Sequence, residues 1–203
     1  MGKTIKILHF LLILLLFFGC DKEEKIIKLP LTQKEIEEAI EYGKKNASLT
    51  FTEFTENWTV GYEYEYGKGK AVLITPFLRV ALLSKNAVEK RQKLNMKIVN
   101  YALKEVADKI FFKVSLYGNY ATFGRTAKFY LEYNGKKIQP ISFYMSPYSQ
   151  FTRDYYHISE GEVKFLNKDI PPNAKIKLVA IFKPYEDEEE KCCSFEFDLS
   201  KFK

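Results

Sequence analysis

From Ile110 onward the sequence alternates between apolar and polar residues, which is the pattern of half-buried β-strands. This alternation constrains the fold more than any other feature, because a helix buries every third or fourth residue instead of every second. Seven segments show the pattern, and short polar turns separate them. They read KIFFKVSLY, RTAKFYLEY, KKIQPISFY, DYYHIS, EVKFL, AKIKLVAIFK and CSFEFDLS.

Two local signals refine the arrangement of these strands. Asn134-Gly135 is the residue pair that type I′ hairpins prefer, so Tyr133 to Lys136 is predicted to form a tight turn. Pro140 cannot donate a hydrogen bond, so its strand is expected at an edge or beside a bulge. Seven short strands with regular turns predict an immunoglobulin-like antiparallel β-sandwich over residues 109–203. The Cys…Trp…Cys spacing of antibody domains is absent, so the prediction concerns architecture alone.

The part before this region, residues 32–108, is predicted to contain helices and a short β-hairpin. Thr32 and Glu35 have the spacing of a capping box, and Thr75-Pro76 reads as an N-cap followed by proline at the first helical position. Helices are expected at about 33–42, 76–94 and 96–108, and strands at about 57–66 and 70–75. The predicted fold class is therefore α+β, with N-terminal helices and a hairpin followed by a C-terminal β-sandwich.

An aromatic run occupies the first of these two strands. Trp58, Val60, Tyr62, Tyr64 and Tyr66 alternate with polar residues or glycine. One interpretation is a stacking platform for sugars or a partner protein, because tyrosine and tryptophan suit such surfaces. Alternation is also the ordinary signature of burial, and core packing is the interpretation we favour for this strand.

The first residues of the chain have the layout of a secretory signal peptide. Lys3 and Lys6 precede an apolar run from Ile7 to Phe18, and Gly19-Cys20 follows it. A membrane-spanning helix needs about 20 apolar residues, so this run is too short for a stable transmembrane anchor. A plain signal peptide, or an uncleaved anchor with an incidental cysteine, is the alternative.

The residues FFGC, ending at Cys20, resemble the lipobox of bacterial lipoproteins. The resemblance implies cleavage after Gly19, a diacylglycerol thioether on Cys20 and usually a palmitate-type acyl chain on the new amino group. It also implies a cell-membrane or outer-membrane location, facing the periplasm or the exterior. Residues 1–19 would then be the signal peptide and 20–31 a lipidated tether, whose charged stretch 21–30 spans at most about 35 Å.

Composition limits the partners. The net charge is +6, and removal of Lys3 and Lys6 with the signal leaves about +4. Lysines and acids are interspersed without a dense basic stripe, so no nucleic-acid partner is expected. The mild positive charge favours an anionic membrane only weakly.

Cys192 and Cys193 are neighbours and cannot join distant strands, so the fold is expected to have no disulfide framework. No cofactor is predicted.

The loop-rich stretch SFYMSPYSQFTRDYYHIS is the first candidate for a recognition edge, because loops on rigid strands often carry binding. Its candidate residues are Tyr144, Tyr148, Phe151, Arg153, Tyr155 and His157. His157 is the single histidine of the mature chain, so neither a histidine-rich metal site nor a Ser-His-Asp triad is expected. As a strand residue, His157 is interpreted as a histidine at the surface or rim.

Two further motifs are weaker candidates. The acidic run of Glu186, Asp187, Glu188, Glu189 and Glu190 offers hard oxygen ligands for Ca²⁺, but it lacks the spacing and glycine of an EF-hand loop. It is interpreted as a solvated hairpin loop, so no metal site is assigned.

The alternation of apolar and polar residues directs the side chain of Cys193 inward and that of Cys192 outward. No C-x-x-C motif supports redox chemistry.

These observations favour a membrane-anchored envelope lipoprotein that serves as a non-catalytic binding or assembly module, with an envelope protein as its partner. The alternative is an exported hydrolase-like enzyme with a carboxylate and tyrosine site between the two halves. No recognisable nucleophile–base or metal constellation supports the enzyme, and no catalytic residue is assigned.

Overall fold

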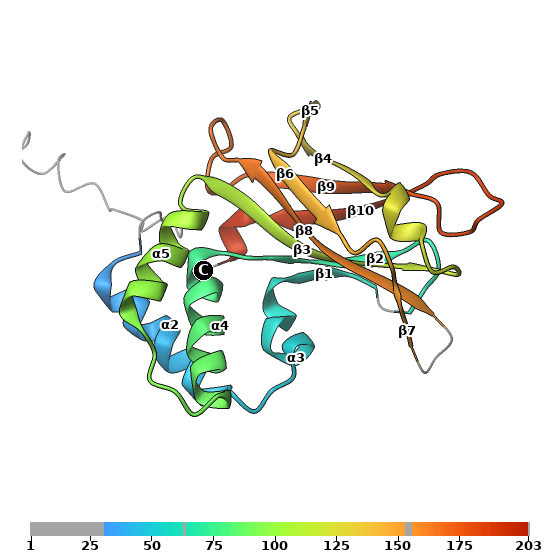
Figure 1. Cartoon of the computed structure of the whole chain (residues 1–203). Coiled ribbons are helices and arrows are strands. Elements are labelled where there is room, and N and C mark those ends of the chain that lie inside the picture. Colours follow the sequence, from blue (N-terminus) through green and yellow to red (C-terminus); the bar gives the residue numbers. More distant parts are fainter. Residues whose placement is uncertain (1–30, 63, 153–155, 203) are drawn as a thin grey trace, which may run out of the picture.

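The computed structural model describes residues 31–62, 64–152 and 156–202, and every element named below lies in these ranges (Figure 1). The helices are α2 (Gln33–Lys45), α3 (Phe51–Thr55), α4 (Pro76–Glu89) and α5 (Met96–Val106), with short 3₁₀ turns at Glu56–Trp58, Phe123–Thr126 and Leu199–Lys201. The fold combines N-terminal helices with antiparallel sheets, which confirms the α+β class.

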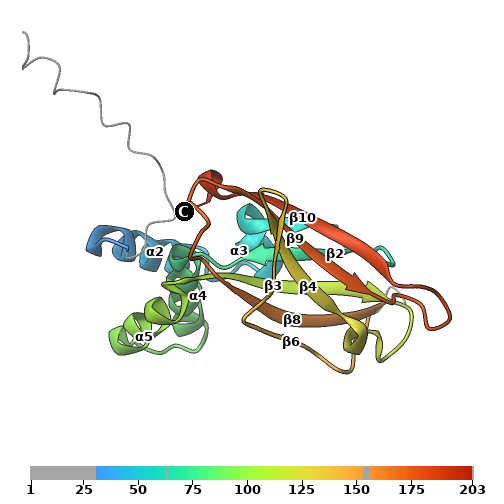
Figure 2. The same cartoon turned by 90° about the horizontal axis from the view of Figure 1, so that it is seen from above.

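The strands form two antiparallel sheets. Sheet A contains β1 (Thr59–Gly61), β2 (Gly69–Leu73), β3 (Lys109–Gly118), β8 (His157–Leu166) and β6 (Ser142–Met145) in that order, and β7 (Gln150–Phe151) also pairs with β8. Sheet B contains β10 (Lys191–Asp198), β9 (Lys175–Phe182), β4 (Lys128–Tyr133) and β5 (Lys136–Ile138) in that order. Figure 2 shows sheet B lying over sheet A, with α2, α4 and α5 together at one end.

Sheet A separates two hydrophobic clusters. Alternate residues of β3, such as Phe112 and Val114, pack with Phe129 and Phe195 of sheet B in the cluster between the sheets. Phe111, on the other face of β3, packs in a second cluster with side chains from α2, α4 and α5. Successive residues of a strand point to opposite faces, so β3 is buried on both faces at the end that the helices cover. The resulting order of layers is helices, sheet A and sheet B.

Local signals place the helix starts as expected. Thr32 and Glu35 form the predicted capping box: the Thr32 amide donates to Glu35 Oε2 over 2.7 Å and the Glu35 amide to Thr32 Oγ1 over 3.2 Å. The Leu78 amide donates to Thr75 Oγ1 over 3.1 Å, which confirms that N-cap too. Helix α2 continues to Lys45, beyond the expected end at about residue 42. Gly43 within it is buried against the backbone of Ala81 and permits the close approach of α4.

Two expected elements are much shorter in the structure. The strand expected at about 57–66 covers only Thr59–Gly61, since Gly61 takes a φ of +119° and turns the backbone away from the ladder. The helix expected at about 76–94 ends at Glu89, and Arg91 with a φ of +52° stops it.

The predicted strands of the C-terminal region are recovered with two differences. DYYHIS and EVKFL contribute to one strand, β8, because Gly161 stays in the ladder opposite Val114. KKIQPISFY is divided at Pro140, so that β5 belongs to sheet B and β6 to sheet A. Asn134 and Gly135 have φ values of +48° and +72°, as the type I′ turn requires.

The hairpin of the N-terminal part does not stand apart from the later strands. Strand β2 pairs along β3 from Gly69 opposite Leu116 to Leu73 opposite Phe112. Sheet A thus crosses the expected boundary between residues 108 and 109. The two helices between β2 and β3 fold back onto the outer face of the sheet that those strands build (Figure 1).

Candidate functional site

The outer face of sheet A, turned away from sheet B, is only partly covered. Helices α4 and α5 cover its end near Phe111. Beyond them lies a groove of about 490 Å³, bounded on one side by Phe51 and Thr52 of α3 and on the other by Tyr144 of β6. We call this the outer groove. It lies between an element of the N-terminal part and strands of the C-terminal part.

Strand register determines which side chains form the floor of the outer groove. Lys70, Ser115 and Glu160 lie in one row across β2, β3 and β8. The next row contains Val72, Lys113, Glu162 and Tyr144, because β6 extends the sheet beyond β8. The floor therefore carries two cations on one side and two carboxylates on the other.

Several of these polar groups already have protein partners. Lys70 Nζ donates to Thr52 Oγ1 over 3.2 Å, and Ser115 Oγ donates to Glu160 Oε1 over 3.3 Å. Lys113 Nζ lies 5.4 Å from the centre of the Phe51 ring, within cation–π range. The groove can bind an extended ligand through paired charges and aromatic walls.

The structure brings three of the predicted recognition residues to one edge of the molecule. Tyr144 lies in β6, Tyr148 in the following loop and Phe151 in β7, and the exposed fraction of each is 62%. Arg153 and Tyr155 lie outside the described residues. Arg125, which the sequence did not single out, holds its guanidinium carbon 4.6 Å from the centre of the Tyr148 ring.

His157 is held as part of the scaffold. Its Nδ1 lies 2.8 Å from Ser149 Oγ, and its ring centroid lies 5.0 Å from that of Phe151. The Ser149 amide also donates to the carbonyl of Ala121 over 2.8 Å, which anchors the loop carrying Tyr148. This geometry agrees with a rim histidine that positions a loop.

Two further apolar side chains are exposed at this edge of sheet A, and Phe143 lies on the face opposite to that of its neighbour Tyr144. Ile141 and Phe143 are 47% and 50% exposed, although Phe143 also contacts Phe129 with ring centroids 5.7 Å apart. Both lie at or beside β6, which is an edge strand of sheet A. We call the five exposed residues together the aromatic edge: Ile141, Phe143, Tyr144, Tyr148 and Phe151.

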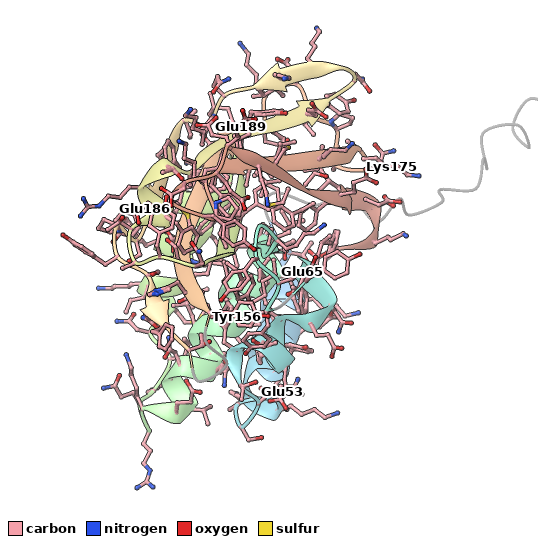
Figure 3. All side chains as sticks on the ribbon, turned by 90° about the vertical axis from the view of Figure 1, so that its right-hand side faces the viewer. Glu53, Glu65, Tyr156, Lys175, Glu186 and Glu189 are labelled. Carbon is pink, nitrogen blue, oxygen red and sulfur yellow. The ribbon has the colours of Figure 1, made fainter. Side chains whose placement is uncertain are left out.

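Tyr64 and Tyr66, which were expected in the core, lie instead in a group of tyrosines at the end of sheet A opposite the helices. Tyr66 and Tyr156 have ring centroids 4.5 Å apart, and Tyr64 lies 5.7 Å from the buried Tyr117. Tyr64 has a φ of +57°, and Tyr62 is 66% exposed. Figure 3 looks onto this end, with Glu65 and Tyr156 near the centre of the view. The core-packing prediction was therefore wrong for Tyr62 and Tyr64.

The acidic run forms ion pairs with neighbouring lysines. Glu188 lies 2.8 Å from Lys191 Nζ and Glu190 lies 2.7 Å from Lys128 Nζ. The segment lies between β9 and β10, as the hairpin interpretation requires. Within the described residues, no group of three or more histidine, cysteine or acidic side chains is arranged to hold a metal ion.

The neighbouring cysteines are both free thiols, with Cys192 exposed and Cys193 buried, which confirms the predicted directions. Burial raises the pKa of the Cys193 thiol to about 12, because the thiolate would lose its hydration. Cys193 is therefore a packing residue of the cluster between the sheets and does not supply a nucleophile.

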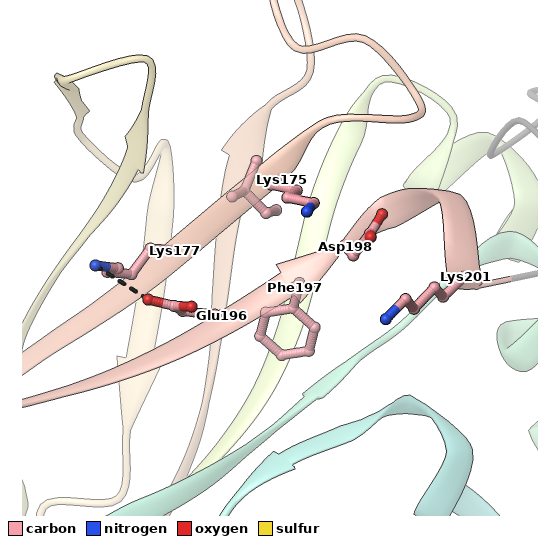
Figure 4. Close-up of a pocket in the computed structure, with 7 residues that line it drawn as sticks. Lys175, Lys177, Glu196, Phe197, Asp198 and Lys201 are labelled. Atoms are coloured by element: carbon pink, nitrogen blue, oxygen red, sulfur yellow. Dashed lines mark ion pairs between the residues drawn. The ribbon is translucent and has the colours of Figure 1, made fainter.

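A second hollow, of about 400 Å³, lies on sheet B beside the end of β10 (Figure 4). Lys177 pairs with Glu196 over 3.2 Å. Asp198 accepts a hydrogen bond from Ser200 Oγ over 2.6 Å, which lowers the pKa of its carboxyl group. The charged groups of this hollow are engaged in an ion pair with one another and in a hydrogen bond of the final turn. The outer groove and the aromatic edge are therefore the stronger candidates for a functional site.

Cys20 and the lipobox-like residues lie outside the described residues. Among residues that are described, no helix is both long and apolar enough to cross a membrane. No model of a known protein family matches this chain, and no curated protein matches it in sequence.

Proposed function

We propose that this chain is a cell-envelope lipoprotein, attached to the membrane through lipid on Cys20, whose folded part is a non-catalytic binding module. The aromatic edge is the observation that carries the binding role. Exposed aromatic side chains along a sheet edge suit an interaction site, because aromatic residues dominate the energy of many interfaces. An envelope protein is the proposed partner.

We further propose an immunoglobulin-like topology for the two sheets. The order β2-β3-β8-β6 corresponds to A-B-E-D, and β10-β9-β4-β5 corresponds to G-F-C-C′. Strand β1 and the helices between β2 and β3 are additions to that plan. Such sandwiches often display binding residues on loops and edges supported by rigid strands, which is where the aromatic edge lies.

The anchor is tested on the protein isolated from membranes. Mass spectrometry of the N-terminus is expected to find a chain that begins at Cys20 and carries a diacylglyceryl thioether. Metabolic labelling with palmitate should label the wild type and the Cys192→Ser variant, and Cys20→Ser should abolish the label. An unmodified thiol at residue 20, or retention of residues 1–19, would refute the anchor.

The binding role is tested by photo-crosslinking in intact cells. A photoreactive amino acid replaces Tyr148 or Phe151 in separate variants, and the control variant carries it at Tyr62, which is similarly exposed but lies beyond β1. One discrete protein adduct from the first two positions, absent at position 62, supports the proposal. Equal adducts at all three positions, or none, would count against the aromatic edge.

The second candidate, an exported hydrolase, is favoured by the outer groove alone. Glu160, Glu162 and Tyr144 supply the residue types that such an enzyme needs, and they lie in the seam between the two parts. The test compares purified wild type with a Glu160→Gln/Glu162→Gln variant on fluorogenic esters and glycosides. Turnover that the double variant loses, while its fold persists, would replace the binding module with an enzyme.

A further inference from the structure

The positive charge of the described protein is concentrated in one short stretch. Residues 90–104 contain five cations and no acid: Lys90, Arg91, Lys93, Lys97 and Lys104. Since the full chain carries +6, the other residues together contribute only +1. All five side chains are exposed, and none of them forms an ion pair with any residue that the structure describes.

Exposed apolar side chains lie among these cations. Tyr101 is 73% exposed, Ile98 51% and Met96 42%, and Val88 at the end of α4 is 44% exposed. Lys97, Tyr101 and Lys104 follow one another at helical spacings of four and three, so they share one face of α5. The opposite face is buried through Val99, Ala102 and Val106, which leaves the first face without a protein partner in the described structure. We call the cations and these apolar residues the α5 patch.

The backbone at Arg91 shows that a cation occupies a position where glycine is usual. The Arg91 amide donates to the Val88 carbonyl over 2.9 Å and the Gln92 amide to the Ala87 carbonyl over 2.8 Å, which is the hydrogen-bond pattern of a Schellman motif. The motif needs a left-handed residue, and Arg91 supplies it with a φ of +52°. Glycine would take that conformation at lower cost, so the arginine is not explained by the turn.

The α5 patch lies at the helical end of the molecule (Figures 1 and 2). The described chain also begins there, because Leu31 precedes α2 by two residues and packs against the helical cluster. The tether to Cys20 is short enough to hold this end near a bilayer, a step that rests on the proposed anchor. Cations around tyrosine and aliphatic side chains match the charge and the interfacial region of an anionic membrane.

We propose that the α5 patch binds the surface of an anionic phospholipid bilayer. The ammonium and guanidinium groups meet the phosphates, while Tyr101, Ile98 and Met96 enter the headgroup region. The lipid on Cys20 holds the chain at the membrane, and the patch turns the helical end toward it. The aromatic edge then remains available at the side of sheet A.

The test uses the mature chain, residues 20–203, with Cys20→Ala, which retains every described helix and strand. Sedimentation is measured with vesicles of phosphatidylcholine containing 30 or 0 mol% phosphatidylglycerol, at about 0.1 M salt where screening is moderate. Binding is expected with the anionic vesicles only. The Lys90→Gln/Lys93→Gln/Lys97→Gln variant should lose about fivefold in partition coefficient for each charge. The control variant Lys136→Gln/Lys137→Gln/Lys175→Gln removes the same charge elsewhere and should bind as the parent does.

Arg91→Gly separates binding from folding. Because glycine suits the left-handed position, this variant is expected to melt a few degrees higher, while its partition into anionic vesicles falls about fivefold. A loss of binding that accompanies a gain in stability cannot result from unfolding.

Three results would overturn the proposal: equal binding to both vesicle types, equal losses in the two triple variants, or patch-dependent retention on heparin without vesicle binding. The last would assign the patch to a soluble polyanion. Since the tested chain has no residue 20 thiol, these outcomes are independent of whether Cys20 is lipidated.

Discussion

At the scale of single residues, Lys85 shows how a buried charge can stabilise a loop. Its ammonium group donates to the carbonyls of Ala47 and Leu49 over 2.7 and 2.6 Å and to Glu89 over 2.7 Å. The side chain is only 7% exposed. It therefore satisfies the backbone that leads from α2 to α3 and so positions the α3 wall of the outer groove.

Lys85→Met keeps an unbranched side chain that is one atom shorter, and it leaves two carbonyls without their donor. We expect the free energy of unfolding to fall by about 2–6 kcal/mol, because each of the two unsatisfied carbonyls costs about 1–3 kcal/mol. Urea unfolding followed by the fluorescence of Trp58, the single tryptophan, measures the change. Lys34→Met on the exposed side of α2 is the control, with an expected change within about 0.5 kcal/mol. Equal stability of both variants would contradict this role.

Single residues also show what the alternation of apolar and polar residues can and cannot predict. It placed Cys193 inside and Cys192 outside correctly, because both residues lie in the regular ladder of β10. It failed for Tyr62 and Tyr64, because Gly61 is the last paired residue of β1 and its positive φ ends the regular ladder before them. A glycine in a short alternating run is the signal that was available and that the prediction did not use.

At the scale of elements, Glu105 joins the helical layer to sheet A. Its carboxylate on α5 lies 3.0 Å from Arg79 of α4 and 3.0 Å from Lys164 of β8. The hydrogen bond from Lys164 is the main cause that lowers the pKa of Glu105 below its ordinary value of 4.5. A carboxyl group with a lowered folded-state pKa contributes stability above its unfolded pKa and loses it as the pH falls through the folded pKa.

Glu105→Gln is therefore expected to lower the free energy of unfolding by about 1 kcal/mol at pH 7, a value reduced by partial exposure of the three side chains. The difference from the wild type should shrink as the pH falls below 4.5. Urea titrations at pH 7 and at lower pH values measure it. In the matched variant Glu37→Gln on α2, the free energy of unfolding should change little at either pH. If the loss of stability in Glu105→Gln were independent of pH, the ion pairs of Glu105 would be excluded as its cause.

Helix starts were the most predictable elements, because a capping box is a local contact between residues three apart. Thr32 and Glu35 were recognised in this way, and Thr50 and Glu53, which form the same box at the start of α3, carry an equal signal that was not used. Strand limits were less predictable. Gly161 within β8 resembles a turn in the sequence, yet it allows β6 to approach, because a Cβ there would meet the Tyr144 carbonyl and Met145.

At the scale of the whole molecule, the pairing of β2 with β3 could not be read from local patterns. The two strands are separated by α4 and α5. Their pairing places Lys70 in the row of Ser115 and Glu160, while the pairing of β3 with β8 places Lys113 opposite Glu162 in the outer groove. The groove therefore depends on register across four strands, which the sequence does not display. The aromatic edge was partly predictable, because Tyr144, Tyr148 and Phe151 lie within one short segment.

Because sheet A carries a hydrophobic cluster on each face, we expect the helices and both sheets to unfold in one transition. Trp58 reports on the helical cluster and Cys193 on the cluster between the sheets. In the Cys192→Ser variant of the mature chain with Cys20→Ala, tryptophan fluorescence and pulsed alkylation of Cys193 should change at the same urea concentration. Native Cys193 should resist alkylation at pH 8, since its pKa of about 12 leaves few thiolates. Two midpoints would mean that residues 32–108 and 109–203 behave as separate folding units despite their common sheet.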